Sequence, residues 1–334
     1  MISRRSALWA ALAGPAAVAP AQRLIGEPEG RTPPIDELIN TLELERVAQR
    51  KLGSEAFAEI ADRGGADRAA FDRITFRPRL MVNTMALDLT TDLFGQSMFA
   101  PILAGPAGAQ QRYHSAGEVE TARGATAAKA VIIVSERSSQ PLENIAAEAP
   151  GFWYQVFAGA SGKLDAAMKA GCKAVCLTVG ATSPGLDWTA IDALRKGLSV
   201  PFLLKGVMSA AEARAAVEHA VSGIIVSSYR GPGTAGMAAS IEVLPAIVEA
   251  VGGRVPILID GGFRRGSDAL KAIALGARAV IVTRPVLWGL AAYGAPGVQQ
   301  SLELLQTELA RDMAMCGRAK IGTVDKTLVR IHRR

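Results

Sequence analysis

Eight short apolar segments, each followed by an amphipathic or alanine-rich segment, recur along the chain of 334 residues. The apolar segments are continuous rather than alternating, which is typical of strands buried on both faces of a parallel sheet. Eight successive βα units predict an α/β protein of the (β/α)₈ or TIM-barrel type, for which about 250 residues are typical. The predicted strands are residues 99–105, 130–135, 152–157, 174–179, 200–206, 223–228, 255–261 and 279–284.

The alternative α/β architecture is an open, doubly wound sheet. It gives no reason for eight repeats, and no predicted strand ends in the G-x-G-x-x-G sequence of dinucleotide-binding folds. We therefore expect a signal peptide at 1–21, a short N-terminal helical segment at 22–75, and the barrel with C-terminal helices at 76–334. Within the last part, we expect segment 85–95 to form a hairpin that closes the bottom of the barrel and 317–334 to be a basic tail.

The first residues have the organisation of an export signal. Arg4 and Arg5 precede an alanine-rich apolar run that ends in an Ala-x-Ala site at Ala19 and Ala21. Paired arginines indicate the twin-arginine route, which exports folded proteins and so suits a protein that takes up a cofactor first. The run is too short to span a bilayer. We expect an exported or periplasmic protein; the alternative is a cytoplasmic protein with a frayed N-terminal helix.

Composition argues against two kinds of partner. The net charge is +6, but the basic residues are spread along the chain and no nucleic-acid-binding module is present, so we expect no nucleic acid partner. Cys172 and Cys176 are four residues apart, yet no second Cys/His pair completes a zinc site, and free cysteine is a common small core residue. We therefore expect no metal.

Polar residues stand at the ends of the predicted strands, where the active site of a (β/α)₈ barrel lies. Burying such groups without partners costs about 1–3 kcal/mol each, so a polar ligand is expected there. The strand-end residues are Pro106, Ala107, Gly108, Ser135, Glu136, Gln155, Thr178, Lys205, Ser227, Tyr229, Asp260, Gly261, Gly262, Thr283 and Arg284.

The last two strands and the fifth indicate the ligand. Gly261 and Gly262 let backbone N–H groups approach an anion, and Arg264 and Arg284 add charged hydrogen bonds, so a phosphate site is expected. Lys205 ends the fifth strand, and a buried lysine needs an anionic partner. A flavin provides one, since its reduced ring carries negative charge near N1 and O2. Gln155 and Thr178 would then bond the ring edge.

The chain also resembles the FMN-dependent α-hydroxy acid oxidases and dehydrogenases, such as glycolate oxidase and lactate oxidase. The resemblance runs from about residue 35 to about residue 320 and is strongest in ILIDGGFRRGSDALKAIALGARAVIVTRP (257–285), with shorter matches at FRPRL (76–80), 114–128, LLKGV (203–207) and GIIVS (223–227). It implies FMN as cofactor, a small-molecule substrate and a homo-oligomer, with a tetramer as the family's habit. The implied FMN-binding residues are Pro106, Ala107, Gly108, Gln155, Thr178, Lys205, Ser227, Asp260, Gly261, Gly262, Arg264, Thr283 and Arg284.

The family's catalytic residues are not retained. The family motif after the sixth strand is S-N-H-G-x-R, in which His is the base and Arg grips the substrate carboxylate. Here Tyr229 stands at the base position and Pro232 at the arginine position. Phe157 replaces a family tyrosine and Gly180 the aspartate that supports the base. Tyrosine, with an ordinary pKa of about 10, is a poor general base at neutral pH.

Three hypotheses follow. The first is an FMN-binding oxidoreductase with altered substrate or chemistry, in which Tyr229 is a proton donor or stacking residue and Arg230 a substitute anion grip. The second is a conventional 2-hydroxy acid oxidase or dehydrogenase with a displaced base, for which Glu136 is the acidic candidate near the ring. The third is a non-catalytic flavin-binding subunit.

The export hypothesis predicts the result of one exchange. A variant carrying both Arg4→Lys and Arg5→Lys should remain in the cytoplasm, because the twin-arginine route reads the arginine pair rather than its charge. Cell fractionation and immunoblotting measure the distribution. Equal periplasmic fractions for the variant and the unchanged chain would show that 1–21 is not such a signal.

Overall fold

The computed structural model describes residues 31–61, 66–157, 161–180, 187–229 and 238–332. The expected signal peptide at 1–21, together with Arg230 and Pro232, lies outside these ranges.

The predicted TIM barrel is confirmed. Eight parallel strands follow the order β4-β11-β10-β9-β8-β7-β6-β5, and a parallel bridge between Ala104 and Ile132 joins the first strand to the last. The strands are β4 (Ile102–Ala104), β5 (Ile133–Ser135), β6 (Trp153–Val156), β7 (Ala174–Thr178), β8 (Phe202–Val207), β9 (Gly223–Val226), β10 (Ile257–Asp260) and β11 (Ala279–Val282).

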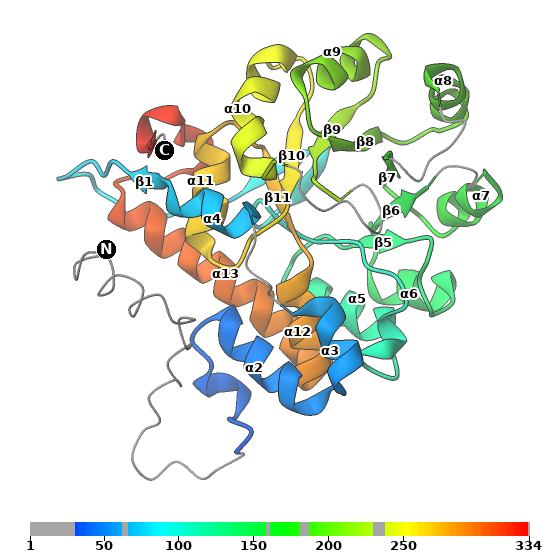
Figure 1. Cartoon of the computed structure of the whole chain (residues 1–334), viewed down its shortest axis with the longest axis horizontal. Coiled ribbons are helices and arrows are strands. Elements are labelled where there is room, and N and C mark those ends of the chain that lie inside the picture. Colours follow the sequence, from blue (N-terminus) through cyan, green and yellow to red (C-terminus); the bar gives the residue numbers. More distant parts are fainter. Residues whose placement is uncertain (1–30, 62–65, 158–160, 181–186, 230–237, 333–334) are drawn as a thin grey trace, which may run out of the picture. The chain divides into compact units, whose positions relative to one another are not determined.

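Helices follow the strands and cover the outside of the barrel (Figure 1). They are α5 (Glu118–Ala127), α6 (Leu142–Glu148), α7 (Ser161–Lys169), α8 (Trp188–Lys196), α9 (Ala210–Glu218), α10 (Ser240–Val251), α11 (Gly266–Ala274) and α12 (Arg284–Tyr293), with α13 (Ala295–Met315) after them. Among the helices in the described ranges, none has the length and apolar character that a membrane span requires.

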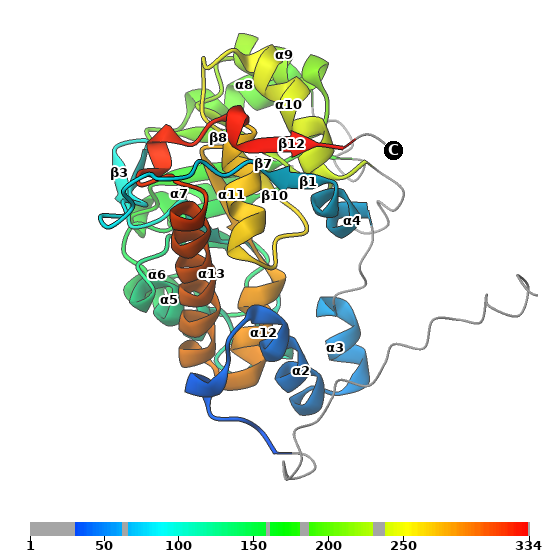
Figure 2. The same ribbon diagram turned by 90° about the vertical axis from the view of Figure 1, so that its left-hand side faces the viewer.

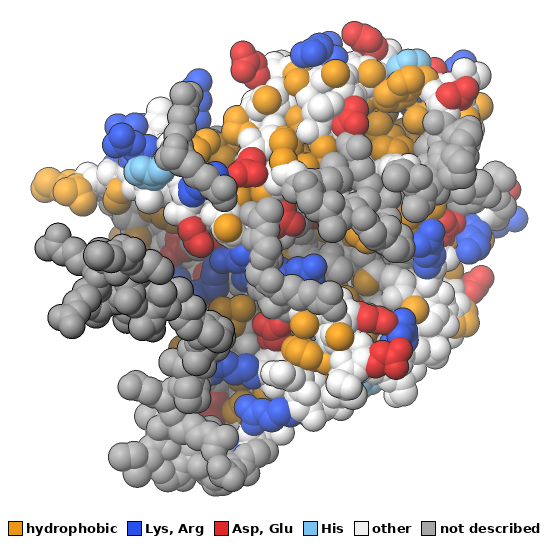
Figure 3. Space-filling model, in the orientation of Figure 1, with side chains coloured by type: hydrophobic (Ala, Val, Ile, Leu, Met, Phe, Trp, Pro, Cys, Tyr) orange, Lys and Arg blue, Asp and Glu red, His pale blue; other side chains and the backbone are white. Residues whose placement is uncertain are grey.

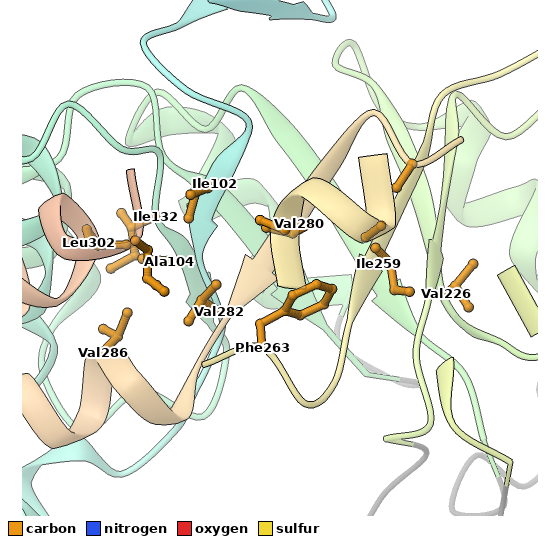
Figure 4. Close-up of a cluster of buried hydrophobic side chains, with 14 of the residues drawn as sticks. Ile102, Ala104, Ile132, Val226, Ile259, Phe263, Val280, Val282, Val286 and Leu302 are labelled. Carbon is orange, nitrogen blue, oxygen red and sulfur yellow. The ribbon is translucent and has the colours of Figure 1, made fainter. Parts of the chain in front are cut away.

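The strands are buried on both faces, which explains their unbroken apolar sequences. Inside the barrel, one cluster includes Leu103, Trp153, Cys176, Leu203 and Ile281. Alternate residues point outward and pack under the helices, as Figure 4 shows for the β4, β10 and β11 side. The outward-facing residues labelled there include Ile102, Ile259, Val280 and Val282. Such two-sided burial is the general property of parallel sheets covered by helices.

A hairpin does form here, but over 91–98 rather than 85–95: β2 (Thr91–Leu93) and β3 (Gln96–Met98) are antiparallel. Leu93 and Met98 belong to the cluster inside the barrel, and the Phe94 ring lies 5.6 Å from that of Trp153. The hairpin therefore fills the bottom of the barrel, so the other end, at the carboxyl ends of the strands, is available for a ligand.

The C-terminal residues are not a simple basic tail. After two short 3₁₀ turns (Ile321–Thr323 and Lys326–Leu328), β12 (Val329–Ile331) pairs antiparallel with β1 (Ile74–Phe76). The expectation for 317–334 was wrong in this respect, because pairing between segments so far apart in sequence leaves no local pattern.

The N-terminal segment is helical, as expected, and packs against the C-terminal helices (Figure 2). A 3₁₀ turn (Ile35–Glu37) precedes α2 (Thr41–Lys51), α3 (Ser54–Ile60) and α4 (Ala66–Asp72). The indole nitrogen of Trp288, in α12, donates to the carbonyl of Ile60 at 2.8 Å. The end of α3 is thereby held beside the carboxyl ends of the strands.

Candidate active site

A cavity of about 510 Å³ opens at the carboxyl ends of the strands. Residues after β4, β5, β6, β8, β9, β10 and β11 line it, together with residues of the N-terminal helices. Its volume is within the range of about 300–1,000 Å³ that small-molecule and cofactor sites occupy.

The floor of the cavity holds a buried lysine. The Lys205 side chain is 2% exposed, and its ammonium nitrogen lies 2.5 Å from Oδ2 of Asp260 and 2.6 Å from Oγ of Ser227. A buried charge is tolerated when it is paired and hydrogen-bonded in this way. An ammonium group has three donors, and these two contacts use two of them. Lys205 also lines the cavity, so one donor remains for an acceptor within it.

Gln155 and Thr178 form a second polar pair, on the adjacent strands β6 and β7. The amide nitrogen of Gln155 donates to Oγ1 of Thr178 at 2.7 Å, and both side chains are buried. The bond fixes the Gln155 amide group, which lines the cavity. A heterocycle with alternating donors and acceptors along its edge, such as a flavin, suits these groups.

A turn of two glycines follows β10. Gly261 and Gly262 have φ values of 105° and 78°, a left-handed conformation that side chains disfavour. A Cβ atom at Gly262 would lie 2.9 Å from Cβ of Asp67 and 3.0 Å from Phe71, so a side chain has no room. The turn therefore requires glycine at both positions.

Two arginines join this turn at the same end of the cavity. Arg264 is buried over the indole ring of Trp288, with its guanidinium carbon 4.9 Å from the ring centroid. Thr283, the N-cap of α12, and Arg284, its first residue, line the cavity, and the first N–H groups of a helix are suited to bind an anion. Backbone donors, a helix N-terminus and two guanidinium groups fit a terminal monophosphate. FMN fits this set together with Lys205 and Gln155 at the ring end.

The remaining sequence-predicted residues for FMN are close by. Pro106, Ala107 and Gly108 line the cavity after β4. Thr178 and Ser227 do not themselves line it, but they bond Gln155 and Lys205, which do.

Helix α4 holds the glycine turn from the outside. No pattern in the sequence indicates this contact. The Arg68 guanidinium donates to the carbonyl of Gly262 at 2.8 Å and lies 2.5 Å from Oδ2 of Asp268. Asp67 lines the cavity and accepts from the backbone N–H of Ser240 at 3.2 Å and from the Ser228 hydroxyl at 3.4 Å. Burial raises the pKa of Asp67, and the negative charge of Asp260 raises it further.

Two residues of the N-terminal half meet at the mouth of the cavity. The Tyr113 hydroxyl donates to Oε2 of Glu59 at 2.9 Å, and Arg112 lies 2.6 Å from Oε1 of the same carboxylate. Burial, and then the bond to Glu59, raise the pKa of Tyr113 to about 12. Tyr113 is therefore protonated at neutral pH and is a donor there.

Tyr229 lines the cavity above the buried lysine. Its ring centroid lies 5.6 Å from the Lys205 nitrogen, and its backbone N–H donates to Oγ of Ser227 at 3.2 Å. The side chain is 45% exposed. The structure thus brings the first of the sequence-predicted catalytic residues to the cavity, while Arg230 is outside the described residues.

Glu136 is placed differently. Its carboxylate accepts from the backbone N–H of Phe157 at 2.9 Å, and it is not one of the residues that line the cavity. Its neighbour Arg137 does line the cavity, with the guanidinium carbon 3.8 Å from the centroid of the Phe157 ring. Sequence analysis named Glu136 and missed Arg137, although the two are adjacent, because the strand pattern does not say which side chain turns inward.

The histidines do not contribute to this site. His114 lies beside Gly294, His219 bonds Asp192 at 2.9 Å, and His332 contacts Thr75 at 2.8 Å. None of the three lines the cavity. In the described part of the chain, no group of three or more His, Cys, Asp or Glu side chains is suited to hold a metal ion.

Comparison with known proteins identifies the family and its cofactor. The chain matches the family described as FMN-dependent dehydrogenase over residues 55–185 and 179–331. It is 33% identical to a peroxisomal (S)-2-hydroxy-acid oxidase of Oryza sativa subsp. japonica, over 87% of this chain and 95% of that protein. It is 32% identical to an L-lactate oxidase of Nostoc sp., over 89% of this chain and 99% of that protein. A crystal structure of mandelate oxidase with (S)-2-phenylpropionate superposes with a TM-score of 0.83 at 32% identity, covering 89% of this chain and 100% of that one.

The phosphate end of the cavity yields a prediction about cofactor retention. Arg264→Ala should weaken FMN binding about tenfold or more, because a hydrogen bond to a charged group contributes about 1.5–3 kcal/mol. Arg264→Lys keeps the charge but not the planar fork, so its affinity should be intermediate. Quenching of FMN fluorescence during titration of apoprotein measures the dissociation constant.

The matched control is Arg330→Ala, an exposed arginine on β12. Its affinity for FMN should be unchanged. Equal affinities for Arg264→Ala and the control would mean that Arg264 does not hold the phosphate.

Proposed function

Since the chain belongs to the FMN-dependent dehydrogenase family and is an FMN-binding oxidoreductase, we propose that its reaction differs from the 2-hydroxy acid oxidation of its relatives. The observation that carries the proposal is Tyr229. It stands over Lys205, at the position where the resemblance places the family's histidine base.

Bound FMN would supply the redox chemistry, accepting two electrons from the donor. The residues of this chain that would bind and orient it are the glycine turn, Arg264 and Arg284 at the phosphate, and Lys205 and Gln155 at the ring. Lys205 places a positive charge where the ring becomes negative on reduction, which favours electron uptake. The resemblance places most of these residues at the family's FMN contacts, except that Glu136 stands where the family has a serine beside the ring.

The residues expected around the substrate, which is the electron donor, differ from those of the family. A phenol hydroxyl is a poor general base, so Tyr229 is suited to donate a hydrogen bond rather than to accept the proton of a substrate. Among the described residues, the carboxylates that line the cavity are Glu59, Asp67 and Asp260. Glu59 is bonded by Tyr113, Asp67 by Ser240 and Asp260 by Lys205, so each already accepts a hydrogen bond.

One observation favours a second candidate, a 2-hydroxy acid dehydrogenase with a displaced base. Asp67 lines the cavity next to Ser228, and its pKa is raised by burial. A raised pKa moves a carboxylate toward the range in which it works as a base at neutral pH. Asp67, rather than Glu136, is therefore the residue to test for that role.

We also propose that the protein acts outside the cytoplasm and self-associates. Export rests on Arg4, Arg5 and the Ala-x-Ala site. Self-association is supported by an exposed apolar loop after β1, which extends at the left of Figure 1 and carries the hydrophobic side chains at the left edge of Figure 3. In this loop Leu80 is 85% exposed and Met85 is 93% exposed, which is unusual for large apolar residues unless a partner covers them.

The proposal predicts that glycolate, lactate and mandelate are oxidised very slowly or not at all. A positioned acid or base contributes about 10²–10⁴-fold, and no free one faces the cavity among the described residues. Tyr229→His should stay nearly inactive, because Phe157, Gly180 and Pro232 are unchanged and the new histidine would lack the aspartate that supports the base in the family. Anaerobic bleaching of the flavin absorbance by each acid measures the reaction.

Rapid bleaching by any of the three acids in the unmutated protein would contradict the proposal. Asp67→Asn and Glu136→Gln then separate the two candidate bases. Loss of bleaching in Asp67→Asn alone would establish the displaced-base dehydrogenase.

A further inference from the structure

The arginines that line the cavity follow different strands. Arg264 and Arg284 follow β10 and β11, at the phosphate end. Arg137 follows β5 and lies against Phe157, which follows β6. In the closed strand order β6 is opposite β10, with β7, β8 and β9 between them on one side and β5, β4 and β11 on the other. Arg137 therefore lies against the residue that follows the strand opposite the glycine turn.

The main chain around Arg137 is fixed. Its carbonyl accepts from the N–H of Ala109 at 3.0 Å, and its N–H donates to Oγ of Ser135 at 3.2 Å. A Cβ atom at Gly108 would come within 2.7 Å of the Arg137 carbonyl oxygen, so the loop after β4 packs directly on this residue. The loop that carries the guanidinium group is therefore held by the barrel.

The guanidinium group itself is held by stacking. Its central carbon is 3.8 Å from the centroid of the Phe157 ring, and the Phe157 main chain is fixed by the bond to Glu136. Stacking covers one face of the guanidinium plane and leaves the N–H groups on its edge available for a bidentate bond.

Arg137 differs from Lys205 and Arg112 in having no carboxylate partner among the described residues. Lys205 is paired with Asp260, and Arg112, at the mouth, is paired with Glu59. No described carboxylate lies within ion-pair distance of Arg137, although it lines the cavity. A planar cation that is exposed to a cavity and unpaired within the described chain is suited to an anion that arrives as a ligand.

We infer that Arg137, stacked on Phe157, is the residue that binds the carboxylate of a small organic acid in the cavity. This inference rests on the proposed function, because the acid would lie beside the bound flavin. It moves the anion grip from the loop after β9 to the wall formed by β5 and β6. The bond is bidentate, from the guanidinium edge to both carboxylate oxygens.

The test is ligand binding to the FMN-loaded protein, followed by the difference spectrum of the flavin. Benzoate is the probe, and benzamide is its uncharged counterpart of nearly equal shape. Benzoate should bind about tenfold or more tightly than benzamide, the ratio expected for one charge-assisted pair. Arg137→Leu should lower the affinity for benzoate to that for benzamide and leave benzamide binding unchanged. Arg137→Lys should be intermediate, because it keeps the charge without the fork.

The matched control is Arg278→Leu, an exposed arginine on the loop before β11 at the other end of the barrel, which should bind benzoate like the unmutated protein. FMN content is measured for each variant. A failure of the cofactor proposal would appear as colourless protein and is thus distinguished from a failure of the Arg137 inference.

Unchanged benzoate affinity in yellow Arg137→Leu protein would overturn the inference, as would equal affinities for benzoate and benzamide in the unmutated protein. Displacement of benzoate by inorganic phosphate at lower concentration than by acetate would overturn the assignment of a carboxylate.

Discussion

The buried ion pair between Lys205 and Asp260 is the interaction on which the rest of the site depends. An ammonium group that is 2% exposed is tolerated only with a carboxylate and a hydroxyl beside it, and these come from β10 and from the end of β9. The pair therefore fixes the relative positions of three neighbouring strands at their carboxyl ends. Removing one partner of such a pair leaves an uncompensated charge, which is far more costly than the pair itself. The glycine turn starts at the next residue, so the same pair also sets where the phosphate end begins.

A second constraint comes from the hydrogen bonds of the acids around the cavity. In the described part of the chain, every carboxylate that lines it accepts a bond from the protein, and these acids tie the N-terminal helices to the barrel. Asp67 and Arg68 hold the turns after β9 and β10 from behind, so α4 supports both the cofactor end and the Tyr229 loop. Arg137 differs from these acids. Hydrogen bonds fix its main chain, but no described carboxylate pairs with its guanidinium group. The cavity thus combines residues that fit a flavin with a changed residue, Tyr229, where the family has its base.

Much of the barrel could be predicted from the sequence, because strands buried on both faces must be apolar throughout, as in AVIIVS and VPILIDG. The polar residues that end these strands, such as Gln155, Lys205 and Asp260, could be predicted to belong to the site. A polar group at the end of a buried strand needs a partner, and a ligand can provide one. Contacts made across long sequence separations could not. The pairing of β1 with β12 and the clamp from α4 depend on which surfaces meet after folding. Glu136 and Arg137 are the most direct example. They are adjacent in a loop, yet Glu136 bonds the main chain of Phe157 and Arg137 lines the cavity, and no sequence period determines which side chain turns inward.

The central claim is that the ring end of the flavin site is intact and functional although the family's base is replaced. The midpoint potential of the bound FMN tests it most directly, because it reports the charge beside the ring and requires no substrate. We predict a potential more positive than that of free FMN, and a shift back toward the free value in Lys205→Met protein that still holds FMN. A potential equal to or more negative than that of free FMN in the unmutated protein would contradict the account.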